Sequence, residues 1–175
     1  MKQNVVDVLM YLFENIITNE EMPGGSIIDE NMMMPGHTYM FDRLEEMGFP
    51  QHEILLAFDW LEDLAEIHND EGSAKNQAAV SIPDGAQSVR IYSELEKMLL
   101  DTGCVSFLMY LEQNQIISPL SREVILDRVI ALDVELELEQ LKWIVMIVLY
   151  SQPGEENAYS WMESLIFDTG MSYIQ

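Results

Sequence analysis

One segment near the C-terminus constrains the fold more than any other part of the chain. Residues 143–150 read WIVMIVLY, with no charged side chain. These eight residues are far fewer than the roughly 18 that a membrane-spanning helix needs. A helix that is apolar on nearly every side must instead be surrounded by other elements of the same protein. We therefore predict a bundle of helices built around residues 138–151.

Most of the remaining chain has apolar residues at steps of three and four, which is typical of amphipathic helices. Asn4 and Ser118 are suited to start helices as N-caps, and Pro50 and Pro119 are suited to a first turn. Gly48 is suited to end one. The predicted helices are residues 5–17, 39–47, 51–67, 94–101, 104–116, 119–132, 138–151 and 156–168.

Two segments lack helical periodicity and are rich in turn residues. We predict loops at residues 18–38, which include a run of three Met, and at residues 69–88, which are rich in Gly, Ser, Asn and Ala. Residues 80–82 and 89–92 alternate between apolar and polar side chains around a Pro-Asp-Gly turn, which predicts a small β-hairpin. Residues 134–139 alternate as well, but the helix start that follows them favours a turn.

The order helix, short helix, helix, loop and alternating segment resembles a winged helix, with residues 51–67 in the position of the recognition helix. We therefore predict a mainly α fold. An N-terminal winged-helix-like portion with a small β-hairpin, residues 1–92, precedes a C-terminal helical bundle, residues 93–175, and the two pack as one cooperative unit. A DNA groove would repel residues 51–67, because they carry five carboxylates and no Lys or Arg.

The chain is expected to have a strongly acidic surface. It contains 31 Asp and Glu against 8 Lys and Arg, a formal net charge of −23, while 49% hydrophobic residues are enough for a sizeable core. Phosphate backbones are poor ligands for such a surface, so we expect no direct binding to nucleic acid or anionic lipid. A basic protein, a cationic peptide or a divalent metal would suit the negative electrostatic field of this surface. The alternative is that the high net charge serves solubility alone.

Three groups of carboxylates are candidate docking faces for a basic protein partner. The alternative for each is a helix face that is simply solvated. Regularly spaced carboxylates can also copy the charge of DNA phosphates, which keeps DNA mimicry open. The groups are Glu45 and Glu46; Glu62, Asp63 and Glu66; and Glu135, Glu137 and Glu139.

The sequence offers little for catalysis or for a cofactor. Cys104 is the only cysteine, which excludes an intramolecular disulfide and a thiol-based zinc site. It is predicted to be a small core residue, although a helix start could also lower the pKa of its thiol. His37, His52 and His68 lie far apart, and no phosphate-binding or nucleophile motif is present. We expect no metal, no cofactor and no enzymatic activity.

The N-terminus has an apolar stretch that Asp7 and Glu14 interrupt, and it has no small-residue cleavage site. This pattern is not that of a signal peptide. We expect a cytoplasmic protein without a membrane anchor.

Several longer segments resemble the Smg family of bacterial proteins. They are VVDVLMYLFENII at residues 5–17, GFPQHEILLAFDWLEDLAE at 48–66, and SVRIYSELEKMLL, FLMYLEQNQII, REVILDRVIALD, LKWIVMIVLYSQPG and ENAYSWMESLIF between residues 88 and 167. Residues 18–38 are longer than the family pattern, and residues 134–137 are slightly shorter. The resemblance implies a cytoplasmic protein of no established activity, often encoded near a DNA-processing protein, and it transfers no catalytic residue.

Three hypotheses for function follow. The first is a non-enzymatic adaptor that binds another protein through acidic helix faces. The second is a regulator linked to DNA processing that acts through a partner or by mimicking the charge of DNA. An enzyme whose motif the sequence does not reveal is the third.

Overall fold

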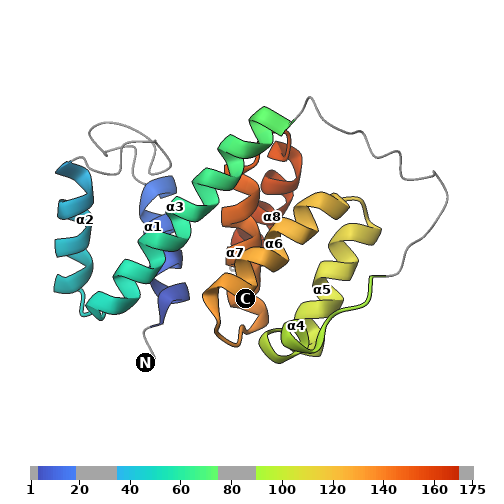
Figure 1. The fold of residues 1–175 in the computed structure, drawn as a ribbon, viewed down its shortest axis with the longest axis horizontal. Coiled ribbons are helices and arrows are strands. Elements are labelled where there is room, and N and C mark those ends of the chain that lie inside the picture. The colour runs from blue at the N-terminus through green and yellow to red at the C-terminus, as the bar shows by residue number, and fades with distance from the viewer. Residues whose placement is uncertain (1–3, 19–34, 75–89, 170–175) are drawn as a thin grey trace.

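The computed structural model describes residues 4–18, 35–74 and 90–169, and these residues form eight helices (Figure 1). The described part of the chain has no β-strand, only an isolated parallel bridge between Leu100 and Leu136. The predicted mainly α fold is therefore confirmed. The helices are α1 (Val5–Thr18), α2 (Pro35–Glu46), α3 (Gln51–Ala74), α4 (Glu94–Leu99), α5 (Thr102–Gln113), α6 (Pro119–Leu132), α7 (Leu138–Ser151) and α8 (Glu156–Thr169).

Helix α7 occupies the centre of the bundle, as its apolar sequence predicts. Leu141 and all residues from 143 to 149 are buried. Helices α1, α3, α5, α6 and α8 all contact α7. None of the described helices is both long enough and apolar enough to cross a membrane. The apolar run therefore forms the core, as predicted.

Local interactions set the start of α1 and the end of α2. The Asn4 side chain accepts a hydrogen bond from the backbone N–H of Asp7, and the Asp7 carboxylate accepts one from the backbone N–H of Asn4, each at 3.1 Å. This reciprocal pair satisfies two amide groups that the start of α1 leaves without helical partners. Gly48, with φ +93°, follows the end of α2 in the left-handed region that glycine adopts readily.

Two helices are longer than predicted. Helix α2 starts at Pro35 rather than at Tyr39, because a proline is tolerated in the first turn, where its missing N–H has no partner to lose. Helix α3 continues to Ala74, whereas residues 69–74 were predicted to be part of a loop. Once a helix has formed, each added residue gains a hydrogen bond at little cost, so polar residues can extend it.

The predicted β-hairpin is not supported. Residues 80–82 and 89 lie outside the described residues, as do most of the predicted loops at 18–38 and 69–88. Residues 90–92 are irregular, with no strand beside them in the part of the chain that the structure describes. Their alternation has another cause, because Tyr92 is buried and Arg90 is largely covered while Ile91 is 87% exposed. Packing on one side produces the same pattern as a strand.

The five C-terminal helices lie close to their predicted positions, although α4 ends at Leu99 rather than at residue 101 and α5 spans Thr102–Gln113 rather than residues 104–116. Ser118 caps α6, with Pro119 in its first turn, and Asp133 ends it in the left-handed region at φ +50°. Residues 134–137 turn into α7, and Leu136 N–H donates to the Leu99 carbonyl at 2.9 Å. The predicted turn is confirmed only at residue 134, because residues 135–137 are extended and Leu136 forms an isolated bridge.

The hydrophobic core continues from the N-terminal helices into the C-terminal ones. Val6, Leu64, Leu108 and Met146 all belong to one cluster of buried residues. Helix α3 contacts both α6 and α7, and α1 contacts α7. The division at residue 92 and the cooperative unfolding of the two portions stay predictions.

Candidate docking surface

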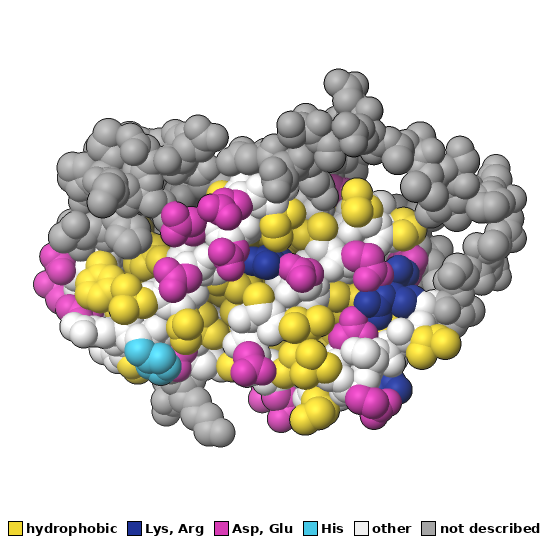
Figure 2. Space-filling model, in the orientation of Figure 1, with side chains coloured by type: hydrophobic (Ala, Val, Ile, Leu, Met, Phe, Trp, Pro, Cys, Tyr) yellow, Lys and Arg dark blue, Asp and Glu magenta, His cyan; other side chains and the backbone are white. Residues whose placement is uncertain are grey.

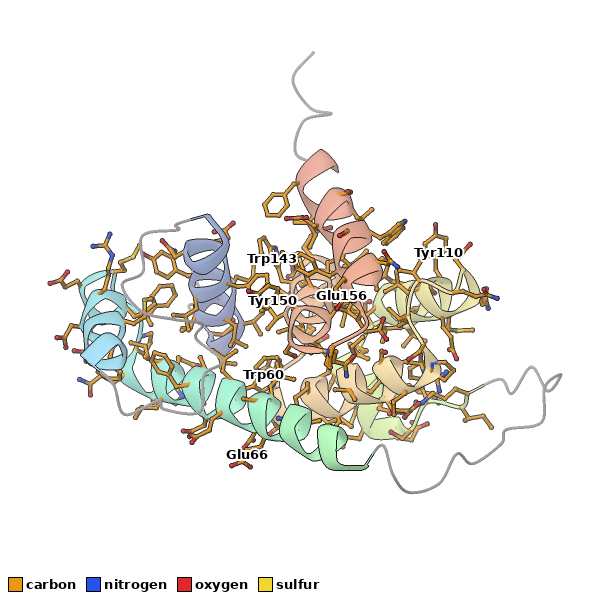
Figure 3. The ribbon with its side chains drawn as sticks, turned by 90° about the horizontal axis from the view of Figure 1, so that it is seen from above. Trp60, Glu66, Tyr110, Trp143, Tyr150 and Glu156 are labelled. Carbon is orange, nitrogen blue, oxygen red and sulfur yellow. The ribbon has the colours of Figure 1, made fainter. Side chains whose placement is uncertain are left out.

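Helix α3 presents an acidic outer face. Ile54, Ala57, Phe58, Leu61 and Leu64 are buried on its inner side. Helical spacing brings the polar positions together on the opposite side, where Asp59, Glu62, Asp63 and Glu66 are exposed. Figure 2 shows acidic side chains gathered over α3 with hydrophobic ones beside them, and in Figure 3 Glu66 lies on the outer side of α3.

Two exposed leucines accompany these carboxylates. Leu55 is 51% exposed and Leu56 is 48% exposed. The apolar spacing of this helix therefore does not place Leu55 in the core. An exposed apolar group among charged neighbours offers contact area to a partner that charge alone does not provide.

Helix α6 supports the acidic face from beneath. The Trp60 indole N–H donates a hydrogen bond of 2.8 Å to the Arg128 carbonyl. The Arg128 guanidinium, only 8% exposed as a residue, donates to Asp127 at 2.8 and 3.2 Å. Its Nη1 lies 3.6 Å from an Asp63 carboxylate oxygen. The Arg128 charge is therefore shared between two carboxylates and does not form a positive patch.

A small hollow opens between α1, α3 and α6. Its volume is about 180 Å³. Apolar side chains form most of the wall, and two carboxylates of α3 stand at one side. The lining residues are Val5, Leu56, Asp59, Trp60, Asp63, Ala131 and Leu132.

The other two predicted groups of carboxylates lie elsewhere on the molecule. Glu45 is half-buried at the end of α2, where it accepts a hydrogen bond from the Gln51 side chain. Its neighbour Glu46 is exposed. The structure thus places this pair beside the start of α3, whereas Glu66 lies four turns further along that helix.

The third group flanks the turn between α6 and α7 (Figure 1). Glu135, Glu137 and Glu139 are all exposed. Lys142 pairs with Glu139 at 2.6 Å, and Glu137 N–H donates to the Gln140 side chain to cap α7. The three predicted groups therefore remain three separate surfaces.

The arginines that could have formed a cationic site are held by carboxylates instead. Arg90 contacts Glu96 and Glu123, each at 2.7 Å. Arg122 pairs with Glu112 and, at 2.6 Å, with the same Glu123. Lys97 and Lys142 are also in ion pairs. Arg43 lies on α2, on the far side of the molecule from this cluster (Figure 1).

This ion network shifts the titration of its members. Arg90 donates two hydrogen bonds to Glu96 and so lowers the pKa of this nearly buried carboxyl to about 2. Arg90 also lowers the pKa of Glu123. The Arg90 guanidinium lies 4.9 Å from the centre of the Tyr92 ring, in a cation–π contact. The network joins residues 90–92 to α4, α5 and α6.

Sequence reasoning missed the network because its members lie far apart in the chain. Arg90 and Glu123 are separated by 33 residues, and no local pattern predicts that they meet. The hollow beside Trp60 was missed for the same reason. The only available signal was the spacing of Asp59 and Asp63, one helical turn apart.

Cys104 is a core residue, as predicted. It is fully buried. Burial is the main reason that the pKa of its thiol is raised to about 12, and the nearby Asp101 carboxylate contributes to the same shift. A thiol with such a pKa is protonated at neutral pH, so the alternative of an activated thiolate is wrong.

Metal ligands do not gather in the described residues. These residues contain no group of three or more His, Cys, Asp or Glu side chains that could hold an ion. His52 is exposed, and the side chains of His37 and His68 lie outside the described set.

A second, more open hollow of about 490 Å³ lies at the turn between α5 and α6. Its two carboxylates already have partners, since Glu112 pairs with Arg122 and Glu155 accepts from the Ser121 hydroxyl. Ser118, in the same wall, caps α6. The polar groups here thus hold the fold together.

Comparison with known proteins identifies the family. A family model described as "Protein of unknown function (DUF494)" matches residues 5–175. A "Protein Smg homolog" from Halorhodospira halophila is 43% identical over 169 residues, which cover 96% of either chain. One from Methylococcus capsulatus is 43% identical over 175 residues, 99% of each chain, and "Protein Smg" of Sodalis glossinidius is 42% identical over 164 residues, 93% of this chain and 94% of its own. No solved structure matches the chain. With relatives of this identity along nearly its whole length, the chain belongs to the Smg family.

Proposed function

We propose that this protein is a non-enzymatic adaptor that binds a basic protein partner through the outer face of α3. One observation carries the proposal: four exposed carboxylates share this face with two half-exposed leucines. The carboxylates attract a cationic surface at long range and help to orient it. The leucines then supply apolar area that can be buried in the complex.

The net charge supports the same class of partner. At −23, the chain repels phosphate backbones and anionic lipid head groups. In the part of the chain that the structure describes, Arg90, Lys97, Arg122, Arg128 and Lys142 are all in ion pairs. Their charge is therefore compensated locally, and the long-range field is that of the surplus carboxylates.

Affinity capture with matched variants tests the proposal. The 175-residue chain is immobilised beside two triple variants, one with Glu62→Gln, Asp63→Asn and Glu66→Gln, the other with Glu135→Gln, Glu137→Gln and Glu139→Gln. Both variants lose three negative charges. We expect the parent and the second variant to retain a basic bacterial protein. The α3 variant should not retain it. The retained protein should elute as salt rises from about 50 to about 300 mM, because screening weakens such contacts.

Equal retention by all three proteins would show that overall charge, and not α3, is responsible. Failure of the parent to retain any protein at low salt would contradict the adaptor role itself.

A regulator linked to DNA processing is the second candidate, acting through its partner or by mimicking the charge of DNA. It is favoured by the regular recurrence of carboxylates along α3 at positions 59, 62, 63 and 66. Under mimicry, duplex DNA would displace the captured protein from the chain, whereas an adaptor complex would withstand DNA at the same ionic strength. Salt-sensitive binding of labelled DNA to the isolated chain would contradict both candidates.

A further inference from the structure

We infer that the hollow between α1, α3 and α6 receives one long cationic side chain, a lysine or an arginine, of the partner protein. This inference rests on the proposed function and names the anchor of that interaction. It concerns a single binding pocket within the wider acidic face of α3.

The size of the hollow selects the kind of occupant. Its volume of about 180 Å³ is well above the roughly 10–15 Å³ that a single water molecule needs. Sites for small molecules commonly measure about 300–1,000 Å³. The hollow is thus too small for most metabolites and large enough for the end of one long side chain.

The wall of the hollow matches the two parts of a lysine or arginine. Trp60 and Leu132 are buried, at 4% and 8% exposure, and supply an apolar floor. Leu56 is half-exposed at the rim, where the methylene stem of an entering side chain would pass. Lysine and arginine characteristically cover apolar surface with the stem and keep the charged head among polar groups.

The charges around the hollow favour a cation at its rim. Asp59 and Asp63 stand one helical turn apart on α3 and both line the hollow. Arg128 lies 3.6 Å from Asp63 but donates its hydrogen bonds to Asp127. Asp59 has no ion pair within the described ranges 4–18, 35–74 and 90–169. Arg128 is thus shared between Asp63 and Asp127, and a second cation at the rim would balance the remaining charge of Asp59.

A peptide titration followed by NMR tests the inference. The probes are three capped pentapeptides with a central arginine, lysine or citrulline between alanines, citrulline being the uncharged counterpart of arginine. The reporter is the Trp60 indole N–H signal, because this group forms the floor and already has a defined partner. We expect the arginine and lysine peptides to shift the Trp60 signal, with citrulline at least 10-fold weaker, and no shift of the Trp161 signal from α8.

Substitutions at the hollow distinguish binding in the hollow from general electrostatic attraction to the acidic face. Ala131→Phe fills the hollow without changing charge, from an exposed position at which the fold should tolerate it. Asp59→Asn removes a carboxylate of the rim, and Glu62→Gln makes the same change of charge on α3 outside the hollow. We expect Ala131→Phe and Asp59→Asn to weaken arginine-peptide binding about 10-fold, and Glu62→Gln less than 2-fold. If Ala131→Phe does not fold, the comparison of Asp59→Asn with Glu62→Gln decides.

Several results would overturn the inference. One is a Trp60 signal that does not shift at millimolar concentrations of the arginine peptide. Another is a shift of equal size with the citrulline peptide. The third is an equal loss of affinity for the arginine peptide in Asp59→Asn and Glu62→Gln. A partner that depends on the α3 carboxylates but binds Ala131→Phe normally would also reject the hollow while leaving the adaptor role standing. Loss of the adaptor role would appear separately, as a parent chain that captures no protein.

Discussion

Trp60 on α3 and Arg128 on α6 are joined by a hydrogen bond of 2.8 Å from the indole N–H to the backbone carbonyl, across 68 residues of sequence. Both residues are nearly buried. The contact links the N-terminal helices to the C-terminal bundle directly beneath the acidic face of α3.

Trp60→Phe should destabilise the protein as a whole. The substitution removes the side-chain hydrogen bond to the Arg128 carbonyl, which contributes about 0.5–1.5 kcal/mol, and it also removes part of a packed ring. Urea unfolding followed by far-UV circular dichroism and by the fluorescence of Trp143 and Trp161 should give one shifted transition. Two separated transitions would contradict the predicted cooperativity of the two portions.

Glu96 should stabilise the fold in a pH-dependent way. Its folded-state pKa of about 2 lies below the ordinary value of 4.5. Its contribution is therefore fully present above about pH 4.5 and is lost as the pH falls towards 2. A shift of this size corresponds to roughly 3 kcal/mol, so Glu96→Gln should lower the free energy of unfolding by up to that amount at pH 7 and by much less near pH 2.5.

Glu94→Gln, in the same turn of α4, is the matched control. Its side chain is 90% exposed and pairs with the exposed Lys97, which makes its contribution small at any pH. Urea titrations of both variants at pH 7 and pH 2.5 measure the difference. Equal effects of the two substitutions would show that the Arg90 network does not stabilise the fold.

Cys104 should resist modification while the protein is folded. With its pKa raised to about 12 and its side chain fully buried, the thiol has little thiolate to react. We expect a disulfide reagent at pH 8 to react at least 100-fold more slowly with the native chain than with the chain in denaturing urea. Rapid reaction of the native protein would mean that α5 opens frequently.

The two sides of α3 should differ sharply in their tolerance of substitution. Leu64 is 2% exposed, so Leu64→Ala should cost about 2–5 kcal/mol by leaving a cavity. Leu55 is 51% exposed, and Leu55→Ala should change stability by no more than about 0.5 kcal/mol. Thermal unfolding of the two variants compares them directly. A similar cost for both would place Leu55 in a buried contact.

Local signals predicted the helices well where they were strong. The Ser118-Pro119 pair and the apolar run of α7 gave the right elements, because capping groups and complete burial act over a few residues. The first turn of α2 and the last turns of α3 were missed. There a proline and a polar segment continue helices that their composition alone would end.

The candidate surface was predicted only in part. Glu62, Asp63 and Glu66 are exposed together as expected, because one helix fixes their relation. Leu56 and Ala131 were not predicted to line a hollow, since it forms only when α6 packs beside α3. Such contacts between distant segments depend on tertiary packing, which periodicity does not encode.

The contact of Leu136 with Leu99 and Leu100 also determines which way the neighbouring side chains point. Leu136 is buried and bridges to Leu100, while Glu135 and Glu137 on either side face solvent. Because successive side chains of an extended segment point in opposite directions, inserting or deleting one residue just before this position would exchange the two sides. A carboxylate would then take the place of the leucine in the interior, so the number of residues linking α6 to α7 is itself under physical constraint.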